Sequence, residues 1–209
     1  MTAPLSPSSL PALFGDMDIY LLDQLLRGRI RDDATVLDAG CGSGRNLVFM
    51  LRAGMNVFAV DASAEAIAAV QQMAAVLAPS LRGDRFLVQS LDALSFANAS
   101  MDVVVCSAVL HFARDEAHFI ACVRELWRVL APGGLLFCRL ASTIGIEAQV
   151  QPLGNRRHAL PDGSERFLVD ALLLHTITEN LRGTLLDPLK TTVVEDMRAM
   201  TTWVVRKEH

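Results

Sequence analysis

Three glycines at alternate positions constrain this chain more than any other feature. Gly40, Gly42 and Gly44 follow the short apolar run 36–37 and precede the apolar run 47–51. The first run is typical of a buried strand, and the second suits a helix. Glycine adopts backbone angles that are closed to other residues, and it lets a ligand approach the main chain closely. Free N–H groups at the start of the following helix add hydrogen-bond donors and partial positive charge beside the loop. The pattern therefore predicts a strand, a ligand-binding loop and a helix.

The spacing of the glycines narrows the choice of ligand. A dinucleotide fingerprint, G-x-G-x-x-G, would place its third glycine at position 45, which is Arg45 here. The observed G-x-G-x-G, preceded by Asp38, resembles instead the first motif of class I S-adenosylmethionine-dependent methyltransferases. A tight strand-to-helix turn without a ligand is the alternative interpretation of the same glycines.

A second passage carries the same resemblance. The sequence LWRVLAPGGLLFCRL, residues 126–140, is similar to the family's helix, Pro-Gly-Gly turn and strand. The G-x-G-R-N ending of the glycine loop also looks like that of small-molecule and tellurite-resistance-type methyltransferases. The resemblance covers about residues 30–207 and is weakest over residues 141–165. It implies a single-domain α/β, Rossmann-like sheet of seven strands, mostly parallel with a C-terminal antiparallel hairpin, and helices on both faces.

The resemblance also implies a cofactor and a reaction. The cofactor is S-adenosyl-L-methionine, with S-adenosyl-L-homocysteine as product, and a small-molecule acceptor receives the methyl group by direct in-line transfer without a metal. The positions that match the family's cofactor contacts, or lie at its cofactor loop, are Asp38, Gly40, Cys41, Gly42, Gly44, Arg45, Asp61, Ala62, Asp92, Ala93 and Ser107.

Asp61 has an argument of its own. The run NVFAVD, residues 56–61, indicates a buried strand that ends in this carboxylate. Ligands of open α/β sheets bind at the carboxyl ends of the strands, where a carboxylate can accept hydrogen bonds from both ribose hydroxyls of a nucleoside. Asp61 can also be an acid at the start of the helix expected over residues 62–78, and the two interpretations are compatible. In the family, the counterparts of Asp92 and Ala93 contact adenine, although loop aspartates without a ligand are common.

His111 is the candidate for the methyl-transfer side. The apolar strand at 102–106 ends next to Ser107, where family members hold the methionine moiety near the methyl group. Imidazole can take a proton from an O–H or N–H nucleophile near neutral pH. The alternative is a histidine that only shapes the pocket. Arg45 pairs with the cofactor carboxylate or lies on the surface of the first helical turn.

The remaining segments outline the domain. Residues 1–15, rich in Pro and Ser, are expected to be a flexible arm, and residues 16–209 the methyltransferase domain. Residues 141–165 lack regular patterning and are interpreted as a substrate-side insertion. Within or beside them, four residues can bind an acidic substrate group or the cofactor carboxylate, or can be solvated charges: Arg139, Arg156, Arg157 and His158. Helices are expected over 116–130 and 167–181, with His118 as a surface or structural residue, and a hairpin from 185–194 and 201–207.

Composition excludes several classes. The chain has 209 residues and is 52% hydrophobic, which suits one domain with a large core. A net charge of −4 argues against a nucleic-acid or anionic-membrane partner. Four cysteines without a C-x-x-C pair indicate reduced thiols in a cytoplasmic protein and no zinc site. The sequence has no recognisable signal peptide and no apolar run of roughly 18 residues. Its oligomeric state stays open.

Three alternatives stand beside the small-molecule methyltransferase. One is a regulatory protein that binds S-adenosylmethionine but has lost transfer activity, which no sequence feature excludes. A nicotinamide-dependent oxidoreductase is opposed by the glycine spacing. A methyltransferase of nucleic-acid amino groups is opposed by the acidic charge and by residues 107–110, which read Ser-Ala-Val-Leu instead of an Asn/Asp-Pro-Pro-aromatic motif.

Overall fold

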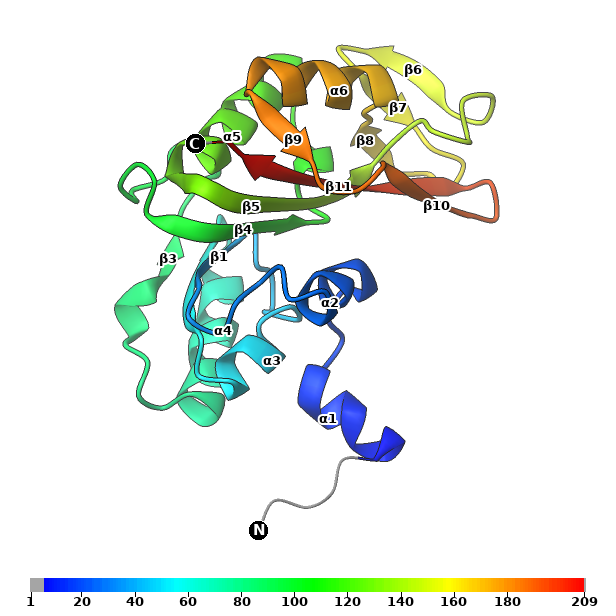
Figure 1. Ribbon diagram of the computed structural model, residues 1–209. Coiled ribbons are helices and arrows are strands. Elements are labelled where there is room, and N and C mark those ends of the chain that lie inside the picture. Colours follow the sequence, from blue (N-terminus) through cyan, green and yellow to red (C-terminus); the bar gives the residue numbers. More distant parts are fainter. Residues whose placement is uncertain (1–5, 209) are drawn as a thin grey trace.

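Two sheets and two layers of helices make up the part of the chain, residues 6–208, that the computed structural model describes (Figure 1). The eight strands of the larger sheet are β1 (Thr35–Ala39), β2 (Asn56–Asp61), β3 (Phe86–Val88), β4 (Met101–Ser107), β5 (Leu130–Ala141), β9 (Gly183–Leu185), β10 (Lys190–Val194) and β11 (Arg198–Lys207). The smaller sheet contains β6 (Gln151–Gly154), β7 (Arg157–Ala159) and β8 (Glu165–Phe167).

Helices cover both faces of the larger sheet, as the sequence predicts (Figure 1). The α-helices are α1 (Leu10–Phe14), α2 (Ile19–Leu26), α3 (Val48–Arg52), α4 (Ala64–Leu77), α5 (Glu116–Val129) and α6 (Ala171–Asn180), and the 3₁₀ turns are η1 (Pro7–Ser9), η2 (Gly83–Arg85) and η3 (Leu110–Phe112). One apolar core joins α5 and α6 to the sheet, with Phe119 and Trp203 at its centre, and a second joins α3 and α4 to the opposite face, around Leu47 and Val57.

The strand order confirms the predicted architecture. It runs β10-β11-β5-β4-β1-β2-β3, in which β1 to β5 pair in parallel and β11 pairs antiparallel with β5 and β10. This path has the predicted seven strands. The additional strand, β9, pairs with β11 at Gly183, where the sequence had indicated only a helix stop. Because β1 lies between β2 and β4, the order reverses there, and ligands of such sheets bind at this reversal.

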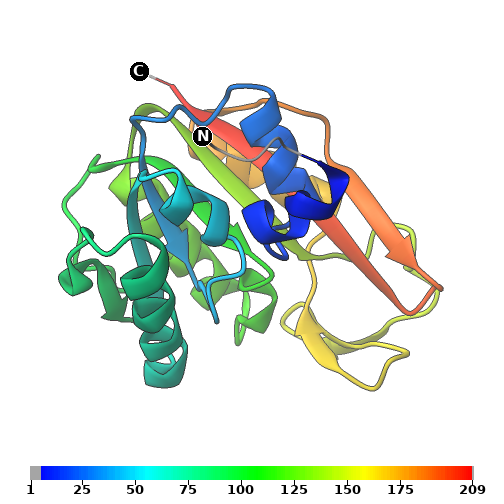
Figure 2. The same ribbon diagram turned by 90° about the horizontal axis from the view of Figure 1, so that it is seen from below.

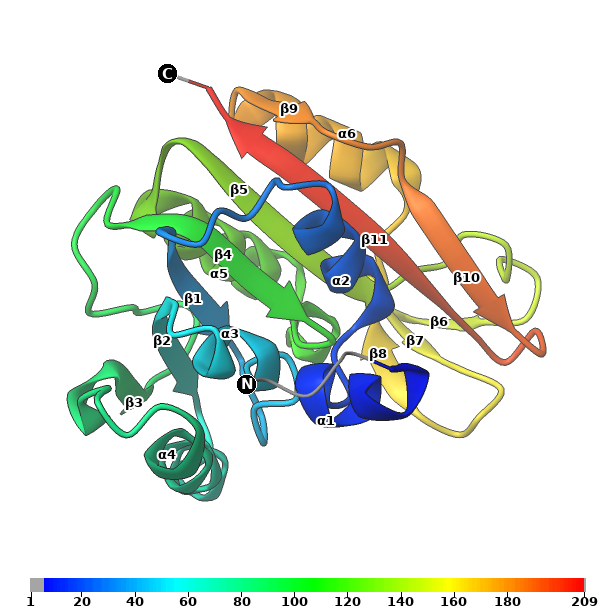
Figure 3. The same cartoon turned by 60° about the horizontal axis from the view of Figure 1, so that its bottom comes forward.

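The prediction that residues 141–165 lack regular structure is wrong for most of this segment. Residues 151–167 form the antiparallel strands β6, β7 and β8, which lie beside the β10–β11 turn (Figure 3). Asn155 and Arg156 turn the chain between β6 and β7 with positive φ angles of 50° and 59°. Helix α6 starts at Ala171, not 167, because Phe167 ends β8 and the Asp170 carboxylate caps the helix by accepting from Leu173 N at 2.7 Å.

The N-terminal segment lies over one face of the sheet. Residues 1–5 of the expected flexible arm lie outside the described part, and residues 6–15 contain η1 and α1, where Phe14 stacks on Phe49 with ring centroids 5.1 Å apart. Figure 2 shows α2 crossing the face that β5 and β11 form. Tyr20 Oη of α2 lies 2.7 Å from Thr192 Oγ1 of β10. Among the described residues, no helix combines the length and apolar character that crossing a bilayer requires.

Candidate functional site

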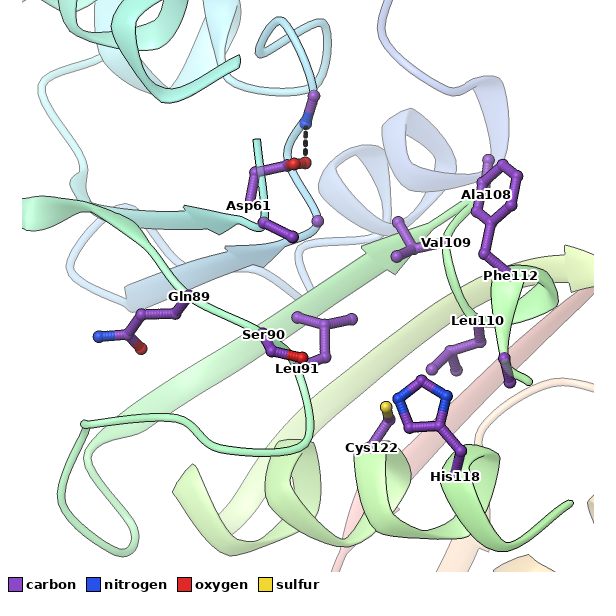
Figure 4. Close-up of a pocket in the computed structure, with 14 residues that line it drawn as sticks. Asp61, Gln89, Ser90, Leu91, Ala108, Val109, Leu110, Phe112, His118 and Cys122 are labelled. Carbon is purple, nitrogen blue, oxygen red and sulfur yellow. Dashed lines mark hydrogen bonds between the residues drawn. The ribbon is translucent and has the colours of Figure 1, made fainter. Parts of the chain in front are cut away.

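A cavity of about 410 Å³ opens at the carboxyl ends of β1, β2 and β4, where the strand order reverses (Figure 4). We call it the glycine-loop cavity. Its lining consists of Gly40, Gly42, Asp61, Ala62, Gln89, Ser90, Leu91, Ala108, Val109, Leu110, Phe112, Ala113, His118 and Cys122. The cavity therefore brings together the loops after β1, β2, β3 and β4 and one face of α5.

The three glycines of the loop serve different purposes. Gly40 has φ +80°, and a Cβ on it would lie 2.5 Å from Val109 Cγ2, so this glycine permits close packing against the loop after β4. Gly44 has φ +83°, and its Cβ would lie 2.9 Å from Met73 Cε of α4. Gly42 has φ +52°, and a Cβ on it would meet only open space, while its backbone faces the cavity. Gly42 is thus the position that leaves room for a ligand.

Asp61 is oriented by the loop itself. Its Oδ2 accepts from Gly42 N at 2.9 Å (Figure 4). Its Oδ1 accepts from Ser63 N, also at 2.9 Å. A carboxylate oxygen has more than one acceptor position, so both oxygens can accept further hydrogen bonds from a ligand. Two hydroxyls on neighbouring carbons are a matching donor pair.

Asp38 places a buried carboxyl group beneath the loop. Burial, helped by the nearby Asp61 and opposed by Arg45, raises the pKa of Asp38 to about 7. Its Oδ2 is buried and has no hydrogen-bond partner in residues 6–208. A buried acceptor without a donor fits a ligand that brings N–H groups or positive charge, which S-adenosylmethionine has in its ammonium group and its sulfonium.

The loop after β3 lines the cavity slightly earlier in the chain than the sequence suggested. Gln89, Ser90 and Leu91 reach the cavity, whereas Asp92 and Ala93 are not among the lining residues. The Asp92 carboxylate accepts from the Ser90 hydroxyl and lies 3.5 Å from His118 Nε2. The adenine contacts of Asp92 and Ala93 stay predictions.

Helix α5 contributes two residues that sequence reasoning missed. His118 was expected to be a surface or structural residue; it is half-buried and lines the cavity with Cys122 (Figure 4). The two are one helical turn apart and so share a face of α5, which is the signal that could have found them. Burial raises the pKa of the Cys122 thiol to about 11, so the thiol is neutral near pH 7.

The other predicted contacts lie behind the cavity wall. Asp38, Cys41, Gly44, Arg45 and Ser107 are not lining residues. Arg45 Nη2 donates to Ser107 Oγ at 3.2 Å, and Ser107 Oγ donates to Asp18 Oδ2 at 3.3 Å. The four cysteines are buried free thiols, and burial raises the pKa of Cys41 above its usual range.

Asp18 is a buried centre of charge that the sequence did not indicate. Its side chain is fully buried, and Oδ2 accepts from Arg139 Nη1 at 3.0 Å and lies 3.6 Å from Arg45 Nη2. Its Oδ1 accepts from Tyr20 N at the start of α2. The sequence offers one signal for Asp18, an acid just before a helical run, and that signal points to a helix cap alone.

A second cavity, of about 330 Å³, adjoins the first, and we call it the arginine cavity. Its lining consists of Ala108, His111, Arg139, Ala141, Leu160, Asp162, Ser164, Arg166, Thr192, Val194, Arg198 and Met200. Ala108 lines both cavities; it has a positive φ of 64°, and its N–H donates to Arg139 O at 2.7 Å. The two cavities therefore meet at the end of β4.

His111 lies in the arginine cavity and not in the glycine-loop cavity. Burial, together with the positive charge of Arg166, lowers the pKa of His111 to about 4. The imidazole is therefore neutral near pH 7. Its Nδ1 is buried and has no hydrogen-bond partner in the described part of the chain.

The basic residues predicted for an acidic substrate divide into two groups. Arg139 lines the arginine cavity. Arg156 instead forms ion pairs with Glu116 at 2.7 Å and Asp170 at 2.8 Å. Arg157 pairs with Glu165 at 3.4 Å, and His158 Nδ1 lies 2.9 Å from Arg156 O. Arg166 and Arg198, which sequence reasoning did not single out, line the arginine cavity in their place.

Comparison with known proteins identifies a domain. A family model described as "Methyltransferase domain" matches residues 37–138. A malonyl-[acyl-carrier protein] O-methyltransferase of Erwinia billingiae is 32% identical over 148 residues, which are 69% of this chain and 53% of the relative. The chain spans about half the length of the curated relatives it matches, or less.

Solved structures share the fold. A methyltransferase from Methanosarcina mazei, described as SAM-dependent, has a TM-score of 0.69 at 20% identity, covering 88% of this chain and 97% of that chain. Magnesium protoporphyrin IX methyltransferase from Synechocystis, solved with bound S-adenosylhomocysteine, has a TM-score of 0.69 at 19% identity, covering 90% and 81%.

Proposed function

The chain carries a methyltransferase domain of the class I, S-adenosylmethionine-dependent family, and from this premise we propose that it methylates a small-molecule acceptor by direct in-line transfer. One observation carries the proposal. Asp61, at the end of β2, presents both carboxylate oxygens beside Gly42 at the mouth of a cavity that the matched domain encloses. The ribose hydroxyls of the cofactor would be held by Asp61, and the buried Asp38 would face its positive charge.

The chain's own residues account for binding, orientation and exclusion of water. The cofactor supplies a methyl carbon that its sulfonium has already activated. Residues 108–110 line the glycine-loop cavity at its border with the arginine cavity, so an acceptor that entered through the arginine cavity would meet the methyl group near Ala108. Apolar lining residues such as Leu91, Val109 and Leu110 exclude water from the glycine-loop cavity.

His111 is proposed as the residue that contacts the acceptor. It is the imidazole of the arginine cavity, and its unpartnered Nδ1 can hydrogen-bond a substrate group. The relative from Erwinia billingiae is named as an O-methyltransferase, which supports an oxygen atom as the nucleophile in this chain.

Calorimetry tests the proposed function. The wild-type chain should bind S-adenosylmethionine and S-adenosylhomocysteine more tightly than NADH. Asp61→Ala should weaken binding of both adenosyl compounds by about a hundredfold or more, because two charge-assisted hydrogen bonds are lost. Asp84→Ala, which removes an exposed carboxylate paired with Arg82, is the matched control and should bind like wild type. Tighter binding of NADH, or an unchanged dissociation constant in Asp61→Ala, would overturn the proposal.

A broad screen for methyl acceptors separates the enzyme from a regulatory protein. Tight binding of S-adenosylmethionine together with turnover of a small-molecule acceptor supports the enzyme. Tight binding with no acceptor turned over would instead favour a protein that binds the cofactor without transferring its methyl group.

A further inference from the structure

The arginine cavity has an excess of positive charge at its wall. Arg139, Arg166 and Arg198 line it together with one carboxylate, that of Asp162. Hydrogen bonds from the Ser164 side chain and backbone lower the pKa of Asp162, and the charges of Arg166 and Arg198 lower it further, so Asp162 is ionised near pH 7. Asp162 cannot neutralise three guanidinium groups, and Asp18, which pairs with Arg139 from outside the lining, is shared with Arg45. The cavity is therefore suited to an anion.

Arg139 keeps hydrogen-bonding capacity for a ligand. Asp18 accepts from its Nη1, but the same Asp18 oxygen also lies 3.6 Å from Arg45, so one carboxylate serves two guanidinium groups. The Arg139 Nε atom is buried and has no hydrogen-bond partner within residues 6–208. Its guanidinium is thus held in place by Asp18 and still offers donors to the cavity.

Two of the arginines stand at the border with the glycine-loop cavity. Arg139 follows Cys138 in β5, and its carbonyl accepts from Ala108, the residue that both cavities share. The Arg166 guanidinium lies 5.0 Å from the centroid of the Phe112 ring, and Phe112 lines the glycine-loop cavity. An anion bound between these arginines would lie on the side from which the methyl group is reached.

The rest of the lining indicates an organic anion. Leu160, Val194 and Met200 give the arginine cavity an apolar side, which a small inorganic anion would leave exposed to water. Planar guanidinium groups match a carboxylate in a bidentate manner. The expected ligand is therefore a carboxylate with an apolar body.

We propose that the arginine cavity binds an organic carboxylic acid through Arg139 and Arg166, and that this carboxylate is the methyl acceptor, giving a methyl ester. The proposal rests on the proposed function. A carboxylate oxygen forms a bond to the methyl carbon while the carbon–sulfur bond breaks and its electron pair stays on sulfur. A carboxylate anion and a sulfonium cation thereby become a neutral ester and a neutral thioether, and no proton has to be removed.

The state of His111 agrees with a nucleophile that is already ionised. A hydroxyl or amine acceptor must lose a proton, and an efficient base has a pKa near the working pH. Burial and Arg166 lower the pKa of His111 to about 4, which makes it a weak base. An ionised carboxylate does not need such a base, and His111 can orient it as a neutral hydrogen-bonding group.

Matched pairs of ligands test the proposal in the presence of S-adenosylhomocysteine. Hexanoate and hexanamide differ in charge and little in shape, and calorimetry should show hexanoate binding more tightly by about tenfold or more. Arg166→Gln should remove that preference. Arg198→Gln, whose side chain is exposed and so endangers folding least, should reduce it. Arg124→Gln, on the exposed face of α5 outside both cavities, is the control and should retain it.

The outcomes separate this inference from the proposed function. If S-adenosylhomocysteine does not bind, the proposed function fails first. If it binds and hexanamide binds as tightly as hexanoate, the function stands and the carboxylate site is overturned. With S-adenosylmethionine, mass spectrometry of mixtures with hexanoate, benzoate and phenylacetate should detect methyl esters. Bound carboxylates that yield no ester would overturn the assignment of the carboxylate as the reacting group.

Discussion

The two adjoining cavities are built in opposite ways. The glycine-loop cavity is formed by backbone turns and short side chains at strand ends, and all its lining residues, 40 to 122, lie inside the segment 37–138 that matches the methyltransferase-domain model. The arginine cavity includes the long charged side chains of Arg139, Arg166 and Arg198, from β5, β8 and β11, and apart from Ala108 and His111 its lining lies beyond residue 138. We therefore propose that the first cavity carries the function shared with the family, and the second the individual chemistry of this chain.

The largest expected effect comes from the glycine loop. Gly40→Ala adds a Cβ 2.5 Å from Val109 Cγ2 at a φ of +80°. Overpacking and the left-handed backbone together should cost about 3 kcal/mol of unfolding free energy, measured by urea denaturation. Gly42→Ala meets no atom within 4 Å, so the backbone cost alone, about 1 kcal/mol, is expected.

For ligand binding, Gly42 should matter more than Gly40, although its substitution costs less stability. Gly42 faces the cavity, so Gly42→Ala should remain folded and bind S-adenosylhomocysteine about tenfold more weakly or worse. Equal losses of stability in the two variants would show that packing against Val109 does not distinguish them. Unchanged binding in Gly42→Ala would remove the argument that its backbone meets the cofactor.

The next largest effect comes from Asp18, which underlies the border between the cavities. Asp18→Asn keeps the shape of the side chain but removes the charge that pairs with Arg139 at 3.0 Å. The variant should lose about 2 kcal/mol of unfolding free energy, the value of a hydrogen bond to a charged group. It should also bind hexanoate a few-fold more tightly, because the positive charge of Arg139 is no longer offset. Unchanged hexanoate binding at unchanged S-adenosylhomocysteine affinity would argue that Arg139 does not reach the ligand.

A smaller effect is expected from His111→Ala. Comparing it with His118→Ala tests whether the two cavities have separate functions. His111→Ala should lower turnover of the acceptor by about tenfold, through a lost hydrogen bond, and leave the dissociation constant of S-adenosylhomocysteine unchanged. His118 lines the glycine-loop cavity, so His118→Ala should weaken the binding of S-adenosylhomocysteine more than it lowers turnover. If both variants changed turnover and cofactor affinity equally, the two cavities would be a single functional unit.

The smallest net effect is on the pH dependence of stability, where the two cavities oppose each other. The pKa of Asp38 is raised from 3.8 to about 7, so its contribution to stability is full below about pH 4 and is lost as the pH rises to about 7. The pKa of His111 is lowered from 6.5 to about 4, so its contribution is full above about pH 6.5 and is lost as the pH falls toward 4.

Single substitutions should reveal the contribution of each residue to the pH dependence of stability. In urea denaturation, Asp38→Asn should become relatively more stable as the pH rises through this window, compared with wild type, and His111→Gln relatively more stable as the pH falls. Profiles of both variants that run parallel to wild type would contradict the buried states assigned to the two residues.

The same contrast explains what could be predicted from the sequence. The glycine loop, the carboxylate at the end of β2 and the Pro-Gly-Gly turn are local patterns, because each is set by residues adjacent in the chain. The sheet architecture followed from them and is confirmed by the observed strand order. Cavity-lining positions near these patterns, such as Gly42 and Asp61, are accordingly where the prediction placed them.

The arginine cavity could not be predicted in this way. Arg139, Arg166 and Arg198 are separated by 27 and 32 positions, and they meet because β11 pairs antiparallel with β5 while β8 belongs to a sheet that the sequence did not indicate. The ion pairs of Arg156 with Glu116 and Asp170 could not be predicted either, because they depend on how α5 and α6 pack. Long-range register, and not local propensity, decided both outcomes.

A crystal structure of the chain with S-adenosylhomocysteine and hexanoate tests the central claim most directly. We expect the ribose hydroxyls on the Asp61 carboxylate, the homocysteine sulfur facing the border at Ala108, and the hexanoate carboxylate between Arg139 and Arg166. An adenosyl group bound elsewhere, or a glycine-loop cavity that stays closed to it, would contradict the assignment of this cavity to the cofactor.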